Sequence, residues 1–296
     1  MKILCAGSLN IDKVYQVPHF VQAGETLAAA GFAQAAGGKG LNQTVALARA
    51  GAEVRHAGAV GADGGLLRQT LRQAGVDDSL LAESSLPTGH AIIQVDPKGQ
   101  NSIIVTAGAN GALERDYLSA MLDGCEAGDI LLLQNETNEL PWLLQEGRRR
   151  GLTVAFNPSP ITPELLDYPL DCVDILILNE IEGAALSGEN DPARIPAALR
   201  ARYPRARVML TLGGDGCVYE DDTQTVRQGI FPVTAVDTTA AGDTFCGYFL
   251  AWLAQGEPVA QALRAASAAA ALAVSRPGAA PSIPQREEVL DFLRSH

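Results

Sequence analysis

The sequence lacks the features that mark several specialised classes of protein. Its five cysteines are far apart and form no C-x-x-C pair, which favours reduced thiols over a disulfide or zinc framework. The N-terminal segment has too few apolar residues for a signal peptide. The alanine-rich stretch 265–274 is apolar but too short to span a bilayer. We therefore expect a cytoplasmic protein with no membrane partner.

An excess of basic residues is also missing. The chain has 22 Lys and Arg against 34 Asp and Glu, for a formal net charge of -12. A general nucleic-acid binder needs a basic surface, so we expect no nucleic-acid partner. A single nucleotide is not excluded, because a phosphate site needs only local N–H groups and one or two cations. With 296 residues, 47% of them hydrophobic, the chain is long enough for a large domain with a sizeable core.

What the sequence does contain is an alternation of short apolar runs with helical patterns. Helices are predicted over 38–50 and 65–74, where apolar residues recur at helical spacing. Strands are predicted at 2–6, 54–60, 130–134, 153–157, 175–179 and 208–213. Such alternation indicates an α/β protein, a three-layer sandwich whose central sheet is mostly parallel.

Two segments interrupt this alternation. Residues 11–33 and 88–107 are rich in β-branched and aromatic residues and contain turn signals, but show no helical period. We interpret them as strands of a small accessory sheet, too short to form an independent domain. The prediction is one α/β domain over 1–296, with a small β-sheet lid inserted at about 11–33 and 88–107.

Polar residues follow many of the predicted strands. Ligands of open α/β sheets lie beyond the carboxyl ends of the strands, so these residues are expected to converge on one edge. They are Asn10 and Asp12 after the first strand, Asn135 and Glu136, Asn157, Asn179 and Glu182, the turn 213–216, and Asp243 after the last.

The segment 235–247, AVDTTAAGDTFCG, is the most informative stretch of the chain. Small residues at a strand-to-helix turn allow backbone N–H groups to converge on an anion at the helix N-terminus. A carboxylate in that turn, Asp243, would repel the anion unless it has a task of its own. The pattern indicates a phosphate site that also needs a base, as in a kinase acting on an alcohol. The alternative is an acid that only balances the helix dipole.

Other motifs have structural alternatives of similar weight. The turn 36–42, AGGKGLN, is not a P-loop. It either lets a polar ligand approach the backbone or serves only tight packing. Asp12 and Asn10 suit the hydroxyls of a polyol, but also suit a turn. Asn179 and Glu182 suit a hydrated magnesium ion, but also a helix cap. The turn 211–216 suits a nucleotide, a β-hairpin or both.

Together these motifs resemble the ribokinase family of carbohydrate and nucleoside kinases. The resemblance covers essentially the whole chain, in order: GSLNID at 7–12, GET at 24–26, GGKGLNQ at 37–43, GAN at 108–110, NPSP at 157–160, NEIE at 179–182, TLG at 211–213, the segment 237–247 and PGAAPS at 277–282. It implies an α/β core with a β lid that often forms a homodimer. It also implies transfer of the ATP γ-phosphate to O5 of D-ribose, giving ribose 5-phosphate.

The resemblance further implies roles for individual positions. Asp243 is then the catalytic base, beside an anion hole from Ala240, Ala241, Gly242 and Asp243 itself. The sugar-contacting positions are Asn10, Asp12, Gly38, Lys39, Gly40, Asn42, Glu136 and Asp243. The nucleotide-contacting positions are Asn179, Thr211, Gly213, Gly214, Asp215, Gly216, Gly242 and Ser267.

Two cations are implied in addition to ATP. Potassium is expected at Asp237, Thr239, Ala273, Arg276, Gly278 and Ser282, several of them through main-chain carbonyls. Magnesium is expected near Asn179 and Glu182, through water. The alternatives are a kinase for deoxyribose, another pentose, a hexose or a nucleoside, and, in a different class, a non-catalytic sugar or nucleotide sensor. Asp243 argues against the sensor, which needs no base.

Overall fold

The centre of the molecule is an eight-stranded sheet, seen in a computed structural model that describes residues 1–296. Its strands, from one edge to the other, are β4 (Val54–Ala57), β1 (Ile3–Ala6), β9 (Ile130–Gln134), β10 (Thr153–Asn157), β11 (Ile175–Asn179), β12 (Arg207–Thr211), β13 (Cys217–Glu220) and β14 (Thr225–Gln228). The first six are parallel, and β13 and β14 add on antiparallel. The predicted mostly parallel sheet is therefore confirmed.

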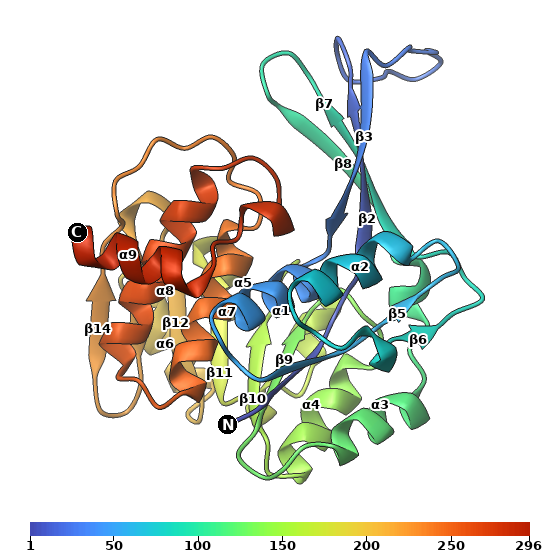
Figure 1. Ribbon diagram of the computed structural model, residues 1–296. Coiled ribbons are helices and arrows are strands. Elements are labelled where there is room, and N and C mark those ends of the chain that lie inside the picture. Colours follow the sequence, from blue (N-terminus) through green and yellow to red (C-terminus); the bar gives the residue numbers. More distant parts are fainter.

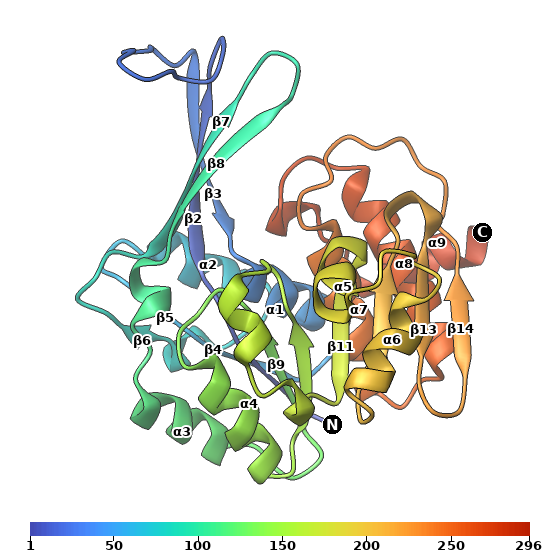
Figure 2. The ribbon, with the colours of Figure 1, turned by 180° about the vertical axis from the view of Figure 1, so that it is seen from behind.

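Helices cover both faces of this sheet, as the alternating pattern predicts (Figures 1 and 2). One face carries α1 (Lys39–Arg49), α2 (Gly65–Gln73), α7 (Ala241–Ala254), α8 (Val259–Val274) and α9 (Arg286–Ser295). The other carries α3 (Arg115–Asp123), α4 (Leu140–Arg149), α5 (Glu180–Ser187) and α6 (Ile195–Arg202). Side chains of β1 alternate between the two resulting cores, with Ile3 and Cys5 in one and Leu4 and Ala6 in the other. None of these helices combines the length and hydropathy needed to cross a membrane.

A second sheet of four strands rises away from the body (Figure 1). Its order is β3 (Gly31–Gly37), β2 (Asn10–Gln16), β7 (Gly89–Val95) and β8 (Asn101–Thr106). The hairpins β2–β3 and β7–β8 are joined by parallel pairing of β2 with β7. The small accessory sheet predicted from 11–33 and 88–107 is therefore present, although β3 continues to Gly37.

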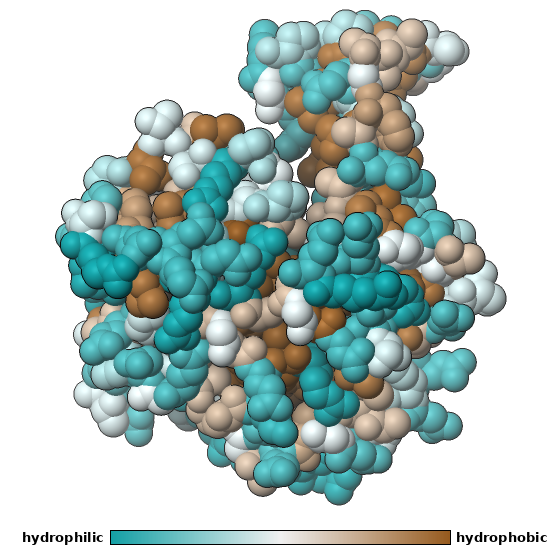
Figure 3. Space-filling model, viewed as in Figure 1, coloured by the Kyte–Doolittle hydropathy of each residue, from teal (hydrophilic) through white to brown (hydrophobic).

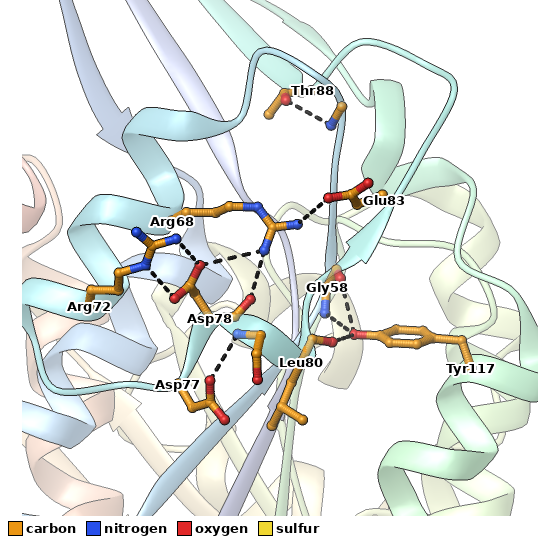
Figure 4. Close-up of polar contacts among 11 residues, drawn as sticks. Gly58, Arg68, Arg72, Asp77, Asp78, Leu80, Glu83, Thr88 and Tyr117 are labelled. Carbon is orange, nitrogen blue, oxygen red and sulfur yellow. Dashed lines mark hydrogen bonds and ion pairs between the residues drawn. The ribbon is translucent and has the colours of Figure 1, made fainter.

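The base of this second sheet is anchored by Thr88, which is fully buried just before β7. The Thr88 hydroxyl donates to the Asp63 carboxylate at 2.6 Å and accepts from the N–H of Gly61 at 2.9 Å. Close by, the Asp78 carboxylate in the short 3-10 helix η1 (Asp78–Leu80) receives two hydrogen bonds from the Arg72 guanidinium of α2 (Figure 4). These bonds fix the connections from which the sheet rises.

Two local predictions are wrong. The run 54–60 forms two strands rather than one, because β5 (Ala59–Val60) leaves the main sheet and pairs with β6 (Ala82–Glu83). Asn10 and Asp12 do follow the first strand and lie at the start of β2, so the alternative that they only form a turn is not supported. Asp243 does not follow a strand, since residues 229–240 between β14 and α7 have no regular structure. For 54–60, pairing with the distant strand β6 decides the outcome, and a local pattern does not contain that information.

Candidate active site

Two cavities meet at the N-terminus of α7. The larger, about 440 Å³, is lined by Thr211, Gly213, Gly214, Gly216, Ile230, Phe231, Val233, Ala235, Thr238, Ala241, Gly242, Phe245, Ser267, Ala270, Ala271 and Val274. The smaller, about 240 Å³, is lined by Lys39, Asn157, Ser159, Ile177, Leu178, Asn179, Glu182, Thr211, Thr238, Ala240, Ala241, Gly242 and Asp243. The wall of the larger cavity is mainly apolar, and that of the smaller cavity is mainly polar. Both include Ala241 and Gly242, so one helix terminus faces both cavities.

The N-terminus of α7 presents free hydrogen-bond donors at this junction. The N–H of Ala241 donates to the Thr238 carbonyl at 3.2 Å, but those of Gly242 and Asp243 make no hydrogen bond within the protein. Ala240, the residue before the helix, has a left-handed backbone with φ of 59°. That conformation is strained for a residue with a Cβ and is typical of functional sites. The turn therefore has the geometry of an anion-binding helix N-terminus.

Asp243 lies in the first turn of α7 and is 8% exposed. Its Oδ2 accepts a hydrogen bond from Asn42 Nδ2 at 3.0 Å, and its Oδ1 accepts one from Gln43 Nε2 at 2.9 Å. Both donors come from α1, 201 and 200 residues earlier in the chain. A carboxylate held by two neutral amides at the edge of a cavity keeps the remaining lone pairs available for a ligand proton.

Gln43 extends this arrangement into a buried amide network that the sequence analysis did not assign to the site. Its Nε2 also donates to Asn157 Oδ1 at 3.1 Å, and its Oε1 accepts from Gln134 Nε2 at 2.7 Å. Gln134 and Asn157 end β9 and β10, so the network ties α1 and α7 to the carboxyl edge of the sheet. The sequence signal that could have indicated this network is the polar residue at the end of each of these apolar strands, Gln134 and Asn157.

Asn42, Asn10 and Asp12 supply polar groups on the side of the second sheet. Asn42 Oδ1 is a buried acceptor without a partner, which suits a ligand hydroxyl. Asn10 is 7% exposed, and its Oδ1 accepts from Asn110 Nδ2 at 2.8 Å. Burial, with a smaller contribution from the Glu136 carboxylate, raises the pKa of Asp12 to about 6. A half-buried carboxylate with no internal partner is suited to accept hydrogen bonds from a ligand.

Glu136 lies where the order of the main sheet changes direction, between β1 and β9. Its Oε2 accepts from the Ser8 hydroxyl and from the backbone N–H of Lys39, the latter at 3.1 Å. Burial alone would lower the pKa of the Lys39 amine, but the surrounding carboxylates, led by Asp243, raise it above its ordinary value. Lys39 therefore stays a cation at the wall of the smaller cavity.

The glycine turn before α1 is required by close packing. A Cβ on Gly40 would lie 2.4 Å from the backbone nitrogen of Ser8, and Gly38 combines a φ of 93° with a similar clash against Asn10. The packing alternative is thus established for this turn, and it brings α1 directly against the β1–β2 connection.

The residues predicted to contact magnesium and the nucleotide form a helix cap, line the cavities, or do both. Asn179 and Glu182 form a capping box at the start of α5, with Glu182 Oε2 accepting from the Asn179 N–H at 3.0 Å, and both also line the smaller cavity. Thr211, the turn glycines and Ser267 line the larger cavity, and the turn is also the predicted β12–β13 hairpin. Asp215 lines neither cavity.

The residues predicted to bind potassium lie on two adjoining loops. Asp237 Oδ1 accepts from the N–H and hydroxyl of Thr239, and its Oδ2 accepts from the N–H of Gly278 at 2.8 Å. The Ala273 carbonyl accepts from the N–H of Arg276, and the buried Ser282 hydroxyl donates to the Ala279 carbonyl. The Arg276 side chain turns away to pair with Glu288 at 2.7 Å.

Comparison with known proteins agrees with this geometry. Residues 1–286 match the model of the pfkB family carbohydrate kinases. The ribokinase of Haemophilus influenzae is 37% identical, with 97% of this chain and 96% of the relative aligned.

Two solved structures are similar over nearly their whole length. The ribokinase of Thermotoga maritima gives a TM-score of 0.88 at 36% identity, covering 99% of each chain. That of Arabidopsis thaliana, complexed with ribose and ATP, gives 0.88 at 31% identity, covering 99% of this chain and 98% of the other. The protein therefore belongs to the pfkB family of carbohydrate kinases.

Proposed function

We propose that this protein transfers the γ-phosphate of ATP to O5 of D-ribose, giving ribose 5-phosphate. The observation that carries the proposal is the position of Asp243 at the junction of an apolar and a polar cavity, beside unpaired N–H groups of α7. A donor phosphate on that helix terminus would lie beside the carboxylate, and the acceptor alcohol would reach Asp243 from the side of the second sheet. The relative from Arabidopsis, whose structure contains ribose and ATP, supports the same pair of ligands.

The acceptor is assigned to the side of the second sheet. Asp12 is mostly ionised at neutral pH, because its raised pKa of about 6 is still below 7. A carboxylate can accept from two vicinal hydroxyls, which favours ribose over deoxyribose. The unpartnered Asn42 Oδ1, together with Asn10, Gly38, Lys39, Gly40 and Glu136, completes the proposed sugar site.

The donor is assigned to the larger cavity. Its apolar wall suits a purine base, and the turn 213–216 allows close approach of the nucleotide to the backbone. Thr211 and Ser267 contribute polar groups to this cavity, and Asn179 contributes one from the adjoining smaller cavity. Gly242 connects the donor site to the anion hole. Asp215 belongs to the same turn, but it does not line the cavity, so we assign it no direct contact with the nucleotide.

In the proposed reaction Asp243 accepts the proton of the attacking hydroxyl. Phosphoryl transfer passes through a loose transition state, so positioning and charge stabilisation account for most of the catalysis. The N–H groups of Gly242 and Asp243 stabilise charge on the transferring oxygens. Lys39 adds positive charge at the wall of the same cavity.

Two cation sites fit the residues present. Glu182 and Asn179 offer oxygen atoms on the smaller cavity, the donor type that Mg²⁺ prefers through water. The carboxylate of Asp237 and the carbonyl-rich loops around Thr239, Ala273, Arg276, Gly278 and Ser282 offer oxygens to K⁺. When bound, Mg²⁺ would neutralise phosphate charge. K⁺ would support the turn that precedes the anion hole.

The second sheet is proposed to act as a lid and as a dimer interface. Its exposed apolar side chains are Phe32, Ile103, Ile104 and Val105, exposed by 56%, 50%, 59% and 61%. Brown, hydrophobic surface is visible along this sheet in Figure 3. Successive residues of a strand point to opposite faces, so Ile104 lies on the other face of the sheet from Ile103 and Val105. Exposed apolar surface marks an interaction site, and a second copy of the chain would cover one of these faces. Closure over the sugar would exclude water from the reaction.

A coupled assay of ADP release tests the function over a panel of pentoses, hexoses and nucleosides. The expected result is the highest kcat/KM with D-ribose, and formation of ribose 5-phosphate. Faster turnover of deoxyribose, a hexose or a nucleoside would move the protein to another substrate within the family. Binding of sugar or nucleotide without any ADP release would instead support the non-catalytic sensor.

A further inference from the structure

Gln43 is placed to control the geometry of the base. The side chain is completely buried, on α1, and is surrounded by polar atoms of three other elements. One amide group bonds to Asp243 on α7, to Asn157 at the end of β10 and to Gln134 at the end of β9. We infer that Gln43 is a positioning residue, which holds the Asp243 carboxylate in the orientation needed to take a proton from the acceptor alcohol. The inference rests on the proposed kinase function.

The network leaves Gln43 only one amide orientation. The Asp243 carboxylate can only accept hydrogen bonds, so the Nε2 of Gln43 must face it, while Gln43 Oε1 accepts from Gln134 Nε2 at 2.7 Å. Gln43 Nε2 donates to Asp243 Oδ1 at 2.9 Å and to Asn157 Oδ1 at 3.1 Å. Asn157 is itself fixed, because its Nδ2 donates to the Ile177 carbonyl at 2.8 Å. The Gln43 donor is therefore anchored to the sheet before any ligand binds.

A neutral donor is the type of group that such a base requires. An arginine or lysine at this position would stabilise the carboxylate and weaken it as a base, whereas an amide orients it without adding charge. The titratable groups that interact with Asp243 are Lys39 from α1, Cys5 from β1 and Cys246 from α7. Burial raises the pKa values of both thiols, so they stay neutral and Lys39 is the one charge in this group.

Two variants distinguish positioning from simple packing. Gln43→Leu keeps most of the volume and removes the donor. We expect kcat to fall roughly 10–100-fold with smaller changes in the KM for sugar and ATP, because a misplaced catalytic group loses rate rather than affinity. Gln43→Glu places a carboxylate against Asp243, and two adjacent carboxyl groups share a proton. The acid limb of its pH–kcat profile should move up by about one unit or more.

Asn138→Asp is the matched control for the second variant. Asn138 is another amide bonded inside the protein, to the N–H and carbonyl of Leu113, and it has no contact with Asp243. The same exchange of amide for carboxyl there should leave the acid limb in place. Circular dichroism and thermal melting establish that each variant is folded. A folded Gln43→Leu with unchanged kcat, or a folded Gln43→Glu with an unmoved acid limb, overturns the inference.

A measurement on the free protein separates this inference from the proposed function. Carboxyl-carbon NMR follows the titration of Asp243, assigned through the signal missing in Asp243→Asn. Gln43→Glu should raise the midpoint of that titration by about one pH unit or more, and Asn138→Asp should not. An unchanged midpoint refutes the contact even if the enzyme phosphorylates ribose. A shifted midpoint in a protein that phosphorylates no alcohol refutes the function and leaves the contact standing.

Discussion

The Asp237 carboxylate accepts a hydrogen bond from the backbone N–H of Gly278 at 2.8 Å. This bond joins the loop before α7 to the loop after α8. The other carboxylate oxygen of Asp237 accepts hydrogen bonds from the N–H and the hydroxyl of Thr239. One carboxylate thus connects the proposed potassium loops with the turn leading to the anion hole.

Asp237→Asn should therefore weaken activation by potassium. Loss of a charged oxygen contact costs about 1.5–3 kcal/mol, which corresponds to a rise of roughly 10–100-fold in the half-saturating K⁺ concentration. Initial rates in potassium and in a tetraalkylammonium buffer measure this. Asp221→Asn is the control, because Asp221 accepts from the N–H and hydroxyl of Thr223 in a similar turn. Equal wild-type rates in both buffers would contradict the cation site itself.

Asp243→Asn should remove the base and keep its shape. We expect kcat to fall by about 10²–10⁴-fold or more, with sugar and nucleotide still bound. Rates come from the ADP assay and binding from calorimetry. Asp222→Asn, at an exposed position, serves as the control for the loss of one negative charge. Near-normal turnover with tight binding intact would show that Asp243 is not the base.

Asp12→Asn should weaken the binding of ribose and remove a pH-dependent loss of stability. Losing the charged acceptor should raise the KM for ribose by roughly 10–100-fold. In the folded protein the pKa of Asp12 is raised to about 6, above its unfolded value, so wild-type stability falls as pH rises from about 4 to 6. The variant should lack this fall, which amounts to at most about 3 kcal/mol. Urea unfolding at several pH values measures it, and parallel curves for the two proteins would contradict the assignment.

His56 should make the protein sensitive to acid. It is buried between α1 and the first strand, with Nδ1 2.7 Å from the Thr44 hydroxyl and Nε2 3.2 Å from the Gly7 carbonyl. Burial lowers its pKa to about 4, so the unfolded chain binds a proton first as pH falls. Stability present above about pH 6.5 should be lost towards pH 4, by about 3 kcal/mol.

Comparison of wild type with His56→Gln in urea isolates that contribution. The difference between the two unfolding free energies should change with pH in the window 4–6.5 and be flat above it. The contribution of His56 to stability increases with pH, whereas that of Asp12 decreases with pH, so the two contributions can be told apart. A pH-independent difference would show that His56 does not become protonated on unfolding.

Ile104→Lys tests the proposed dimer. Ile104 is 59% exposed on β8, and a charge in the middle of an apolar interface is unfavourable. Sedimentation should show a dimer for wild type and a monomer for the variant. Leu166→Lys, at an exposed apolar residue of the main body, should stay dimeric. A monomeric wild type at micromolar concentration would contradict the interface.

Local chemistry in the sequence determined much of this structure. The apolar runs that end at Gln134, Asn157 and Asn179 are strands, because continuous hydrophobic segments are buried on both faces of a parallel sheet. The second sheet was predictable from its β-branched residues and turns. The small residues around Gly242 indicated an anion site, since a helix N-terminus with little side-chain bulk presents free N–H groups.

Other features depend on contacts between distant parts of the chain, and only the tertiary structure decided them. The sequence did not show that 54–60 divides between two sheets, because pairing partners are remote. Nor did it show that Gln43 would meet Asp243, 200 residues further on, through a network completed by β9 and β10. A base can be recognised from its own turn, but its orientation comes from donors that the fold brings to it.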